Sequence, residues 1–218
     1  MAFLESTKKF NVISPINQLG YGVTGLNVIK SLLSNGHDVS LFVLGQLQAD
    51  PKLHDFIKGC FESSRMPDFD APCLRIWHQH DMSEWVGSGE KIGFPIFELN
   101  KFTPQEIHHL KHPDKLFVCS QWAKDIVLEQ LGDSIKEENV YVIPLGVDRS
   151  IFRESISSRP TTTFINIGKW EIRKGHDILI EAFNRAFTKD DNVELWMMCD
   201  NPFHTDEQNF EWERKYRG

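Results

Sequence analysis

Apolar residues near the N-terminus occur first in a continuous run and then at helical spacing. Residues 10–14 form the first run, and residues 38–44 form a second that is typical of a fully buried parallel strand. From about residue 23 to residue 34, apolar side chains recur three and four positions apart. Asn35 and Gly36 follow, and both accept the left-handed backbone that ends a helix. The pattern predicts a strand, a helix and a second strand, which form a βαβ unit.

The alternation of strands and helices continues to about residue 143. Thr103 and Glu106 form a capping box, Ser120 caps a further helix, and Gly132 ends it. Pro95 indicates that the strand around it lies at an edge or a bulge. Helices are predicted near residues 52–58, over a segment that starts at residue 103, and over 121–131. Strands are predicted over residues 74–78, 91–97, 116–119 and 141–143. Parallel strands need crossover helices, so the pattern predicts an α/β, Rossmann-like, doubly wound parallel sheet.

A second domain of the same type begins after a polar stretch. We predict an N-terminal domain over residues 1–152, a linker over 153–162 and a second Rossmann-like domain over 163–218. The second domain contains a strand over 163–167, a helix over 175–187, a strand over 193–199 and a polar helix over 205–217. Only the first βαβ part of that domain is therefore expected in this sequence. The uncovered edge of such a sheet predicts self-association.

Composition narrows the classes of partner. The 218 residues carry a formal net charge of -7, which disfavours nucleic acid because Lys and Arg are not in surplus. The four cysteines lack CxxC spacing and are expected to be reduced, and no apolar run is long enough to span a membrane. The first residues lack the apolar core of a signal peptide. We therefore expect a cytoplasmic protein without an integral membrane segment.

Two glycine-containing turns could contact anions. Gly168 to Gly175 follows an apolar strand, precedes a helix and includes Lys169, Arg173 and Lys174. Free N–H groups at a helix start and nearby cations suit a phosphate, although an ordinary solvated turn has the same composition. Gly20-Tyr21-Gly22 forms a similar glycine-rich loop after the first strand.

Histidines raise the question of a metal site. His78 and His80 alternate, so their side chains point to the same face of an extended segment. A metal would need a third ligand, for which His108, His109 and His112 are candidates. Scattered histidines on a surface helix explain that cluster more simply, and we expect no metal cofactor.

The order of motifs resembles the retaining GT-B glycosyltransferases, the large family that includes bacterial mannosyltransferases and sucrose and glycogen synthases. The segments that carry the resemblance are GYGVTG, FELNKFTPQE, FVCSQWAKDIVLEQLG with VYVIPLGVD, and GKWEIRKGHDILIEAF. Together they span about residues 10 to 187. The pairing of PLGVD with GKWEIRKG across a linker is the most specific of these matches.

The resemblance implies transfer of a sugar from a nucleotide-diphosphate-sugar to an acceptor, with retention of configuration and without a metal. Lys169, which stands where the family usually has arginine, and Lys174 would grip the donor diphosphate, with Gly22 near it. His80 matches the histidine near the transferred sugar, and His78 is the alternative. Gly20, Tyr21 and Glu98 would line the acceptor side of the cleft, although Glu98 also fits a local cap or ion pair.

The sequence departs from the family after residue 199, because it lacks the acidic Glu-x7-Glu motif that contacts the donor sugar and ribose. We therefore expect weak or absent catalysis by this chain as written. Two alternatives stay open. One is a non-catalytic binding module or remnant of a glycosyltransferase. The other is a nicotinamide-dependent Rossmann enzyme, which is disfavoured because no clear acid follows the second strand.

Overall fold

The computed structural model describes residues 7–154 and 159–216. The chain forms two compact units, Met1–Val147 (unit 1) and Asp148–Gly218 (unit 2). The division falls between Val147 and Asp148, whereas the sequence analysis ended the first domain at residue 152. Residues 155–158 of the predicted linker, residue 217 of the predicted last helix and the first six residues lie outside the described part.

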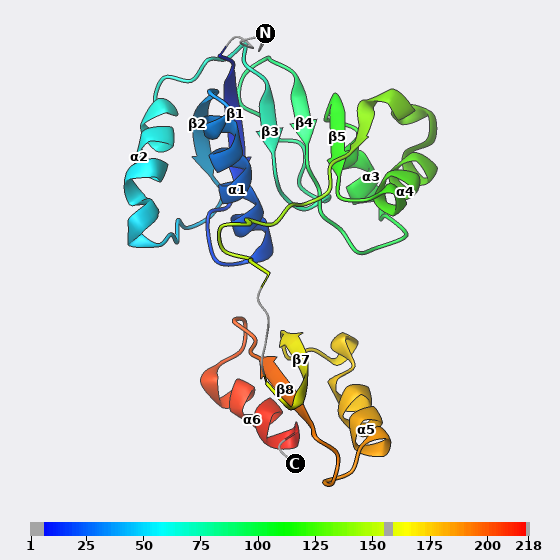
Figure 1. Ribbon diagram of the computed structural model, residues 1–218. Coiled ribbons are helices and arrows are strands. Elements are labelled where there is room, and N and C mark those ends of the chain that lie inside the picture. The colour runs from blue at the N-terminus through cyan, green and yellow to red at the C-terminus, as the bar shows by residue number, and fades with distance from the viewer. Residues whose placement is uncertain (1–6, 155–158, 217–218) are drawn as a thin grey trace. The chain divides into compact units, whose positions relative to one another are not determined.

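Unit 1 is built on a six-stranded sheet in the order β2-β1-β3-β4-β5-β6, and every neighbouring pair is parallel. The strands are β1 (Lys9–Ser14), β2 (Asp38–Val43), β3 (Cys73–Arg75), β4 (Lys91–Gly93), β5 (Lys115–Val118) and β6 (Val140–Val142). Because all strands run the same way, their carboxyl ends meet at one edge of the sheet (Figure 1). The predicted α/β, Rossmann-like sheet is confirmed for this unit.

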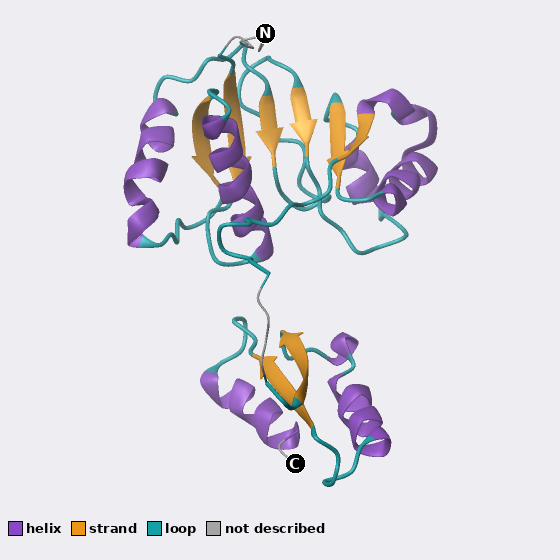
Figure 2. Ribbon diagram, viewed as in Figure 1, coloured by secondary structure: helices purple, strands orange, loops and turns teal. Residues whose placement is uncertain are grey.

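Helices flank this sheet (Figure 2). They are α1 (Gly20–Ser34), α2 (His54–Ser63), α3 (Pro104–Leu110) and α4 (Gln121–Leu131), with single 3-10 turns at Pro51–Leu53, Gly132–Ser134 and Glu137–Asn139. α1 packs against β1 and β2, α2 against β2, and α4 against β5 and β6. Two apolar clusters form the core, one centred on β1 with α1 and α2 and the other on β5 with α3 and α4. Val12, Leu41, Leu116 and Val118 are fully buried in these clusters.

The predicted helix ends form as local hydrogen-bond chemistry requires. Thr103 and Glu106 make the complete capping box, with Pro104 at the first position of α3. The Ser120 hydroxyl accepts a hydrogen bond from the Ala123 N–H. Gly36 and Gly132 have φ values of 79° and 50°, the left-handed region that glycine adopts without strain.

Several strand predictions are corrected by the tertiary structure. β3 and β4 have three residues each, so Trp77 and His78 lie in a loop rather than a strand. β4 is an interior strand, and Pro95 follows it instead of marking an edge. β2 is one of the two edge strands, with only Val39 and Leu41 buried, so the expectation of a fully buried strand over residues 38–44 was wrong.

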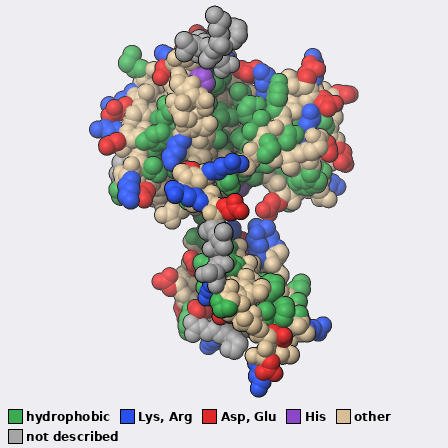
Figure 3. All heavy atoms as spheres, in the orientation of Figure 1, with side chains coloured by type: hydrophobic (Ala, Val, Ile, Leu, Met, Phe, Trp, Pro, Cys, Tyr) green, Lys and Arg blue, Asp and Glu red, His purple; other side chains and the backbone are tan. Residues whose placement is uncertain are grey.

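Unit 2 contains two parallel strands and two main helices. The elements are β7 (Thr162–Gly168), a 3-10 turn (Ile172–Lys174), α5 (His176–Ala186), β8 (Val193–Cys199) and α6 (Asp206–Tyr216). Trp170, His176 and Asn201 are its most buried side chains. Hydrophobic side chains are visible on its surface (Figure 3), and Ile165, Ile167, Trp196 and Met198 on the strands are exposed. Self-association through this sheet stays a prediction.

Candidate functional site

The sheet has a topological switch point at its carboxyl edge. From β1 the chain passes to β2 on one side and then returns to β3 on the other, and both strands pair directly with β1. The loops that leave β1 and β3 therefore diverge. In open α/β sheets this switch point is the usual ligand site. The loop after β1 leads into α1, and the loop after β3 carries His78 and His80.

Tyr21 joins three segments at this switch point. Its hydroxyl donates to the Ile96 carbonyl at 2.5 Å and accepts from the Ile96 N–H at 3.2 Å. The ring of Tyr21 packs against the rings of Trp77 and His78, with centroid separations of 5.3 and 4.6 Å. Burial raises the pKa of Tyr21 to about 12. Tyr21 therefore stays neutral and connects α1 to the loops after β3 and β4.

His78 is more enclosed than His80. Its ring is half-buried against Tyr21 and Trp77, whereas His80 is exposed and stacks on His78 with centroids 5.1 Å apart and an interplanar angle of 13°. Burial and then the nearby His80 lower the pKa of His78, against a smaller opposing effect of Asp81. Within the described residues neither imidazole has a hydrogen-bond partner, so both rings can contact a ligand. We call Tyr21, Trp77, His78 and His80 the aromatic cluster.

Arg75 holds the loop that carries this cluster. Its side chain is 1% exposed, and its Nη2 atom lies 2.8 Å from Asp81 Oδ2. Its Nε also donates to the Asp81 carbonyl at 2.8 Å, and its Nη1 donates to the Glu84 carbonyl at 3.3 Å. The ion pair with Asp81 and the two hydrogen bonds to carbonyls compensate much of the cost of burying this guanidinium, although its Nη2 atom makes no hydrogen bond of good geometry. Arg75 therefore positions the loop that carries His78 and His80, which we call the histidine loop. This role was not predicted from the sequence.

Gln79 fastens the same loop to α3. Its Nε2 donates to Glu106 Oε1 at 2.8 Å, and the Thr103 N–H donates to Glu106 Oε2 at 2.6 Å. Burial alone would raise the pKa of Glu106, but the hydrogen bonds from Thr103 and Gln79 outweigh it and the pKa is lowered. The capping box of α3 therefore also supports the histidine loop.

The depressed pKa of Glu106 predicts a pH-dependent contribution to stability. The contribution is complete above the unfolded-state pKa of about 4.3 and is lost as the pH falls through the lower folded-state pKa. We expect Glu106→Gln to lower the free energy of unfolding by about 1 kcal/mol at pH 7, and by less near pH 3.5. Urea unfolding at both pH values measures this, with the exposed Glu129→Gln as the control. A deficit that is equal at the two pH values would contradict the assignment.

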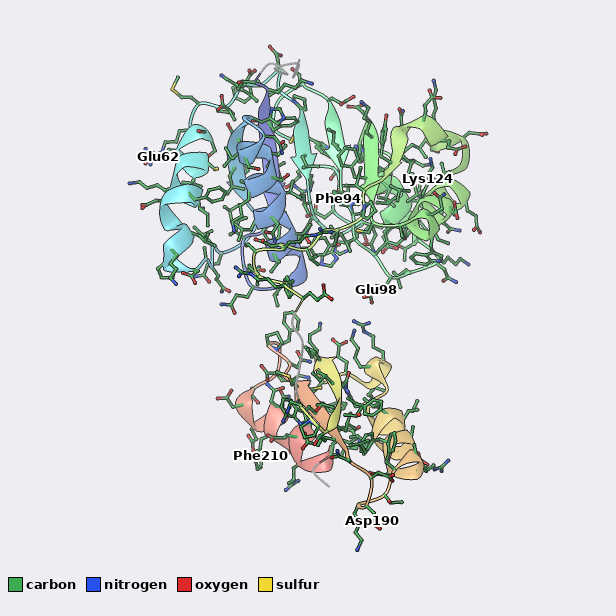
Figure 4. The ribbon with its side chains drawn as sticks, in the orientation of Figure 1. Glu62, Phe94, Glu98, Lys124, Asp190 and Phe210 are labelled. Atoms are coloured by element: carbon green, nitrogen blue, oxygen red, sulfur yellow. The ribbon has the colours of Figure 1, made fainter. Side chains whose placement is uncertain are left out.

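The other predicted residues of unit 1 divide into two groups. Gly20 and Gly22 belong to the first turn of α1 and not to a loop, which corrects the prediction. A Cβ on Gly22 would lie 2.3–2.5 Å from Asn17 atoms, so Gly22 is required for close packing of α1 on the loop after β1. Glu98 is exposed at the carboxyl edge of the sheet (Figure 4) and does not join the aromatic cluster.

The basic turn of unit 2 is partly neutralised from within. Lys169 Nζ lies 2.9 Å from Glu171 Oε1, and Arg173 Nε lies 2.9 Å from Glu171 Oε2. These contacts lower the pKa of Glu171, and the hydrogen bond from Lys169 has the largest effect. Lys174 is exposed and has no ion-pair partner within the described residues. The sequence pattern predicted a cationic turn from its three basic residues and did not reveal that Glu171 pairs with two of them.

His176 organises the turn that bears these cations. Its ring is 1% exposed, Nδ1 lies 2.9 Å from Asn166 Nδ2, and Nε2 lies 2.9 Å from the Lys169 carbonyl oxygen. An imidazole that accepts from Asn166 and donates to Lys169 satisfies both contacts. His176 also packs edge-on against Trp170. The position directly after Gly175, at the helix start, was the available signal for this role.

Other features of the described residues were not predicted as sites. A hollow of about 520 Å³ on α6 is lined by Glu211, Trp212, Arg214 and Lys215, none of which belongs to a predicted site. Within the described ranges, no group of three or more His, Cys, Asp or Glu side chains could hold a metal ion. No helix of the described part has both the length and the apolar character to cross a membrane.

No family model matches the chain, and comparison with curated proteins finds no match.

Proposed function

We propose that the chain is a glycosyltransferase of the retaining GT-B type, which moves a sugar from a nucleotide-diphosphate-sugar to an acceptor without a metal. The observation that carries the proposal is the aromatic cluster at the switch point of a parallel sheet. Tyr21 comes from a segment distant in sequence from the loop that carries His78 and His80, and the two segments meet where Rossmann-like sheets bind ligands. The sequence resemblance connects the same loops to sugar transfer.

The start of α1 supplies the anion-binding part of this proposal. No acidic residue occurs in its first turn, and its N-cap residue, Leu19, provides no side-chain acceptor for the free N–H groups. Those groups and the positive end of the helix dipole favour a phosphate oxygen. Gly22 allows the helix start to approach the loop after β1 closely. In the proposed reaction this turn stabilises charge that develops on the departing diphosphate.

His78 and His80 have different roles in the proposal. His80 is exposed and stacked on His78, so it can contact the transferred sugar directly. The pKa of His78 is lowered, which favours a neutral imidazole near pH 7 in the ring that stacks on His80. Tyr21 holds both through its ring and its two bonds to Ile96.

Glu171 favours the alternative function, a non-catalytic binding module. Because Lys169 and Arg173 already contact Glu171, only part of the cationic charge of the turn faces a ligand. A weak nucleotide site without turnover would fit this charge balance. The two functions separate in one assay, since the glycosyltransferase consumes nucleotide-sugar in the presence of acceptor and the binding module only binds it.

Lys174 provides a direct test of the nucleotide site. We expect Lys174→Ala to weaken binding of a nucleoside diphosphate by about 1–2 kcal/mol, because a charged hydrogen bond is lost. Calorimetric titration with UDP, GDP and ADP measures the change. Lys189→Ala is the matched control, since Lys189 is an exposed lysine in the loop beyond the other end of α5. Equal affinities of the Lys174→Ala and Lys189→Ala variants for every nucleotide would remove Lys174 from the site.

A further inference from the structure

A compact group of three imidazoles lies at the end of α3, on an element that the proposed transfer does not use. The ring centroids of His108, His109 and His112 are 5.0 to 6.3 Å apart. The closest atoms are His108 Nε2 and His112 Nε2, which are separated by 3.4 Å. His108 and His112 are both exposed, so water and ions can reach the two nitrogens.

The 3.4 Å separation matches the requirement of a shared metal ion. Two imidazole nitrogens about 2.0–2.1 Å from a tetrahedral Zn²⁺ are about 3.4 Å apart. The same distance is longer than the range of about 2.7–3.2 Å that is usual for N–H···O hydrogen bonds, so a direct hydrogen bond between the two rings is weak. Imidazole suits Zn²⁺, Cu²⁺ and Ni²⁺ among the divalent ions.

His109 is positioned beside the pair and not as a third ligand. Its Nδ1 accepts a hydrogen bond from the Met82 N–H at 3.3 Å. A neutral imidazole that accepts at Nδ1 carries its proton on Nε2, which leaves no lone pair there for a metal. The absence of three-ligand groups within the described residues agrees with this arrangement.

We propose that His108 and His112 form a bidentate site for a divalent transition metal ion, with water completing the coordination shell. The ion would bridge His108, in the last turn of α3, and His112, which lies two positions beyond the last helical residue, Leu110. Neutral imidazole is the form that binds metal.

The test is calorimetric titration of the tag-free chain with ZnCl₂, in a buffer that does not chelate metal. We expect one ion per chain, with affinity reduced by about tenfold or more in His108→Ala and in His112→Ala. His109→Gln is the matched control and should retain binding. His80→Ala tests the other close imidazole pair and should also retain it.

Imidazole NMR signals provide a second readout that does not depend on the heat of binding measured by calorimetry. Zn²⁺ should shift the ring signals of His108 and His112 together and leave those of His78 and His80 in place. Equal zinc affinity across all four variants would indicate adventitious surface binding and overturn the proposal. Loss of binding only in His80→Ala would assign the metal to the other pair and overturn it as well.

Discussion

Gly22→Ala is expected to destabilise unit 1 by about 2–3 kcal/mol, the upper range for overpacking. The added Cβ would meet Asn17 Oδ1 at 2.3 Å, Asn17 N at 2.4 Å and Asn17 O at 2.5 Å. Two of these atoms belong to the backbone, so a side-chain rotation cannot relieve the clash. The first turn of α1 must therefore move away from the loop after β1, and Tyr21 moves with it.

Gly20→Ala is the matched control for this substitution. Gly20 lies two residues earlier in the same turn, and a Cβ there would meet nothing within 4 Å. Alanine at this position should be neutral or stabilise by about 0.5 kcal/mol, because the unfolded chain loses conformational freedom. Urea unfolding measures both variants, and peptide-resolved hydrogen exchange assigns the change to unit 1. If the two variants proved equally stable, the close approach at Gly22 would be refuted.

Arg75→Met is expected to lower the free energy of unfolding of unit 1 by about 3 kcal/mol, the lower end for breaking a buried ion pair. Methionine fills much of the buried volume but removes the contacts to the Asp81 carboxylate, the Asp81 carbonyl and the Glu84 carbonyl. Hydrogen exchange should accelerate over residues 76–86. The pKa of His78 should rise toward its ordinary value as the loop opens and burial decreases.

Lys58→Met is the control for loss of an ion pair without burial. Lys58 pairs with Glu62 at 3.9 Å, and their side chains are 70% and 54% exposed. Surface pairs of this kind contribute about 0–1 kcal/mol, so the control should remain near wild type. A loss in Arg75→Met no larger than in Lys58→Met would show that Arg75 does not hold the histidine loop.

The sequence by itself determined the elements whose signals are local. The capping box at Thr103, the Ser120 cap and the glycine ends at Gly36 and Gly132 depend on hydrogen bonds and backbone freedom within a few residues. The strand over residues 193–199 in unit 2 was predicted with its observed bounds, because a nearly continuous apolar run marks it clearly. Periodicity also located the parallel α/β character of unit 1.

The candidate site was only partly accessible to sequence reasoning. Motif order placed Tyr21 and Gly22 directly after the first strand and His80 after a later strand, and in the structure these segments lie at the switch point. It could not decide that His78 is the more enclosed imidazole, because that depends on Tyr21, which lies 57 positions earlier and is itself bonded to Ile96. Glu171 was overlooked beside Lys169 because a count of cations does not reveal which acid folds back on them.

Only the tertiary structure decided the strand order, the burial of Arg75 and the close approach at Gly22. β4 became an interior strand although Pro95 had suggested an edge, since pairing with β3 and β5 is settled by the packing of distant segments. Arg75 became a buried positioning residue because Asp81 of its own loop pairs with the guanidinium and accepts a hydrogen bond from it once the loop is folded. Local signals in the sequence define elements, whereas the contacts that define a site form between elements and exist only when these are packed together.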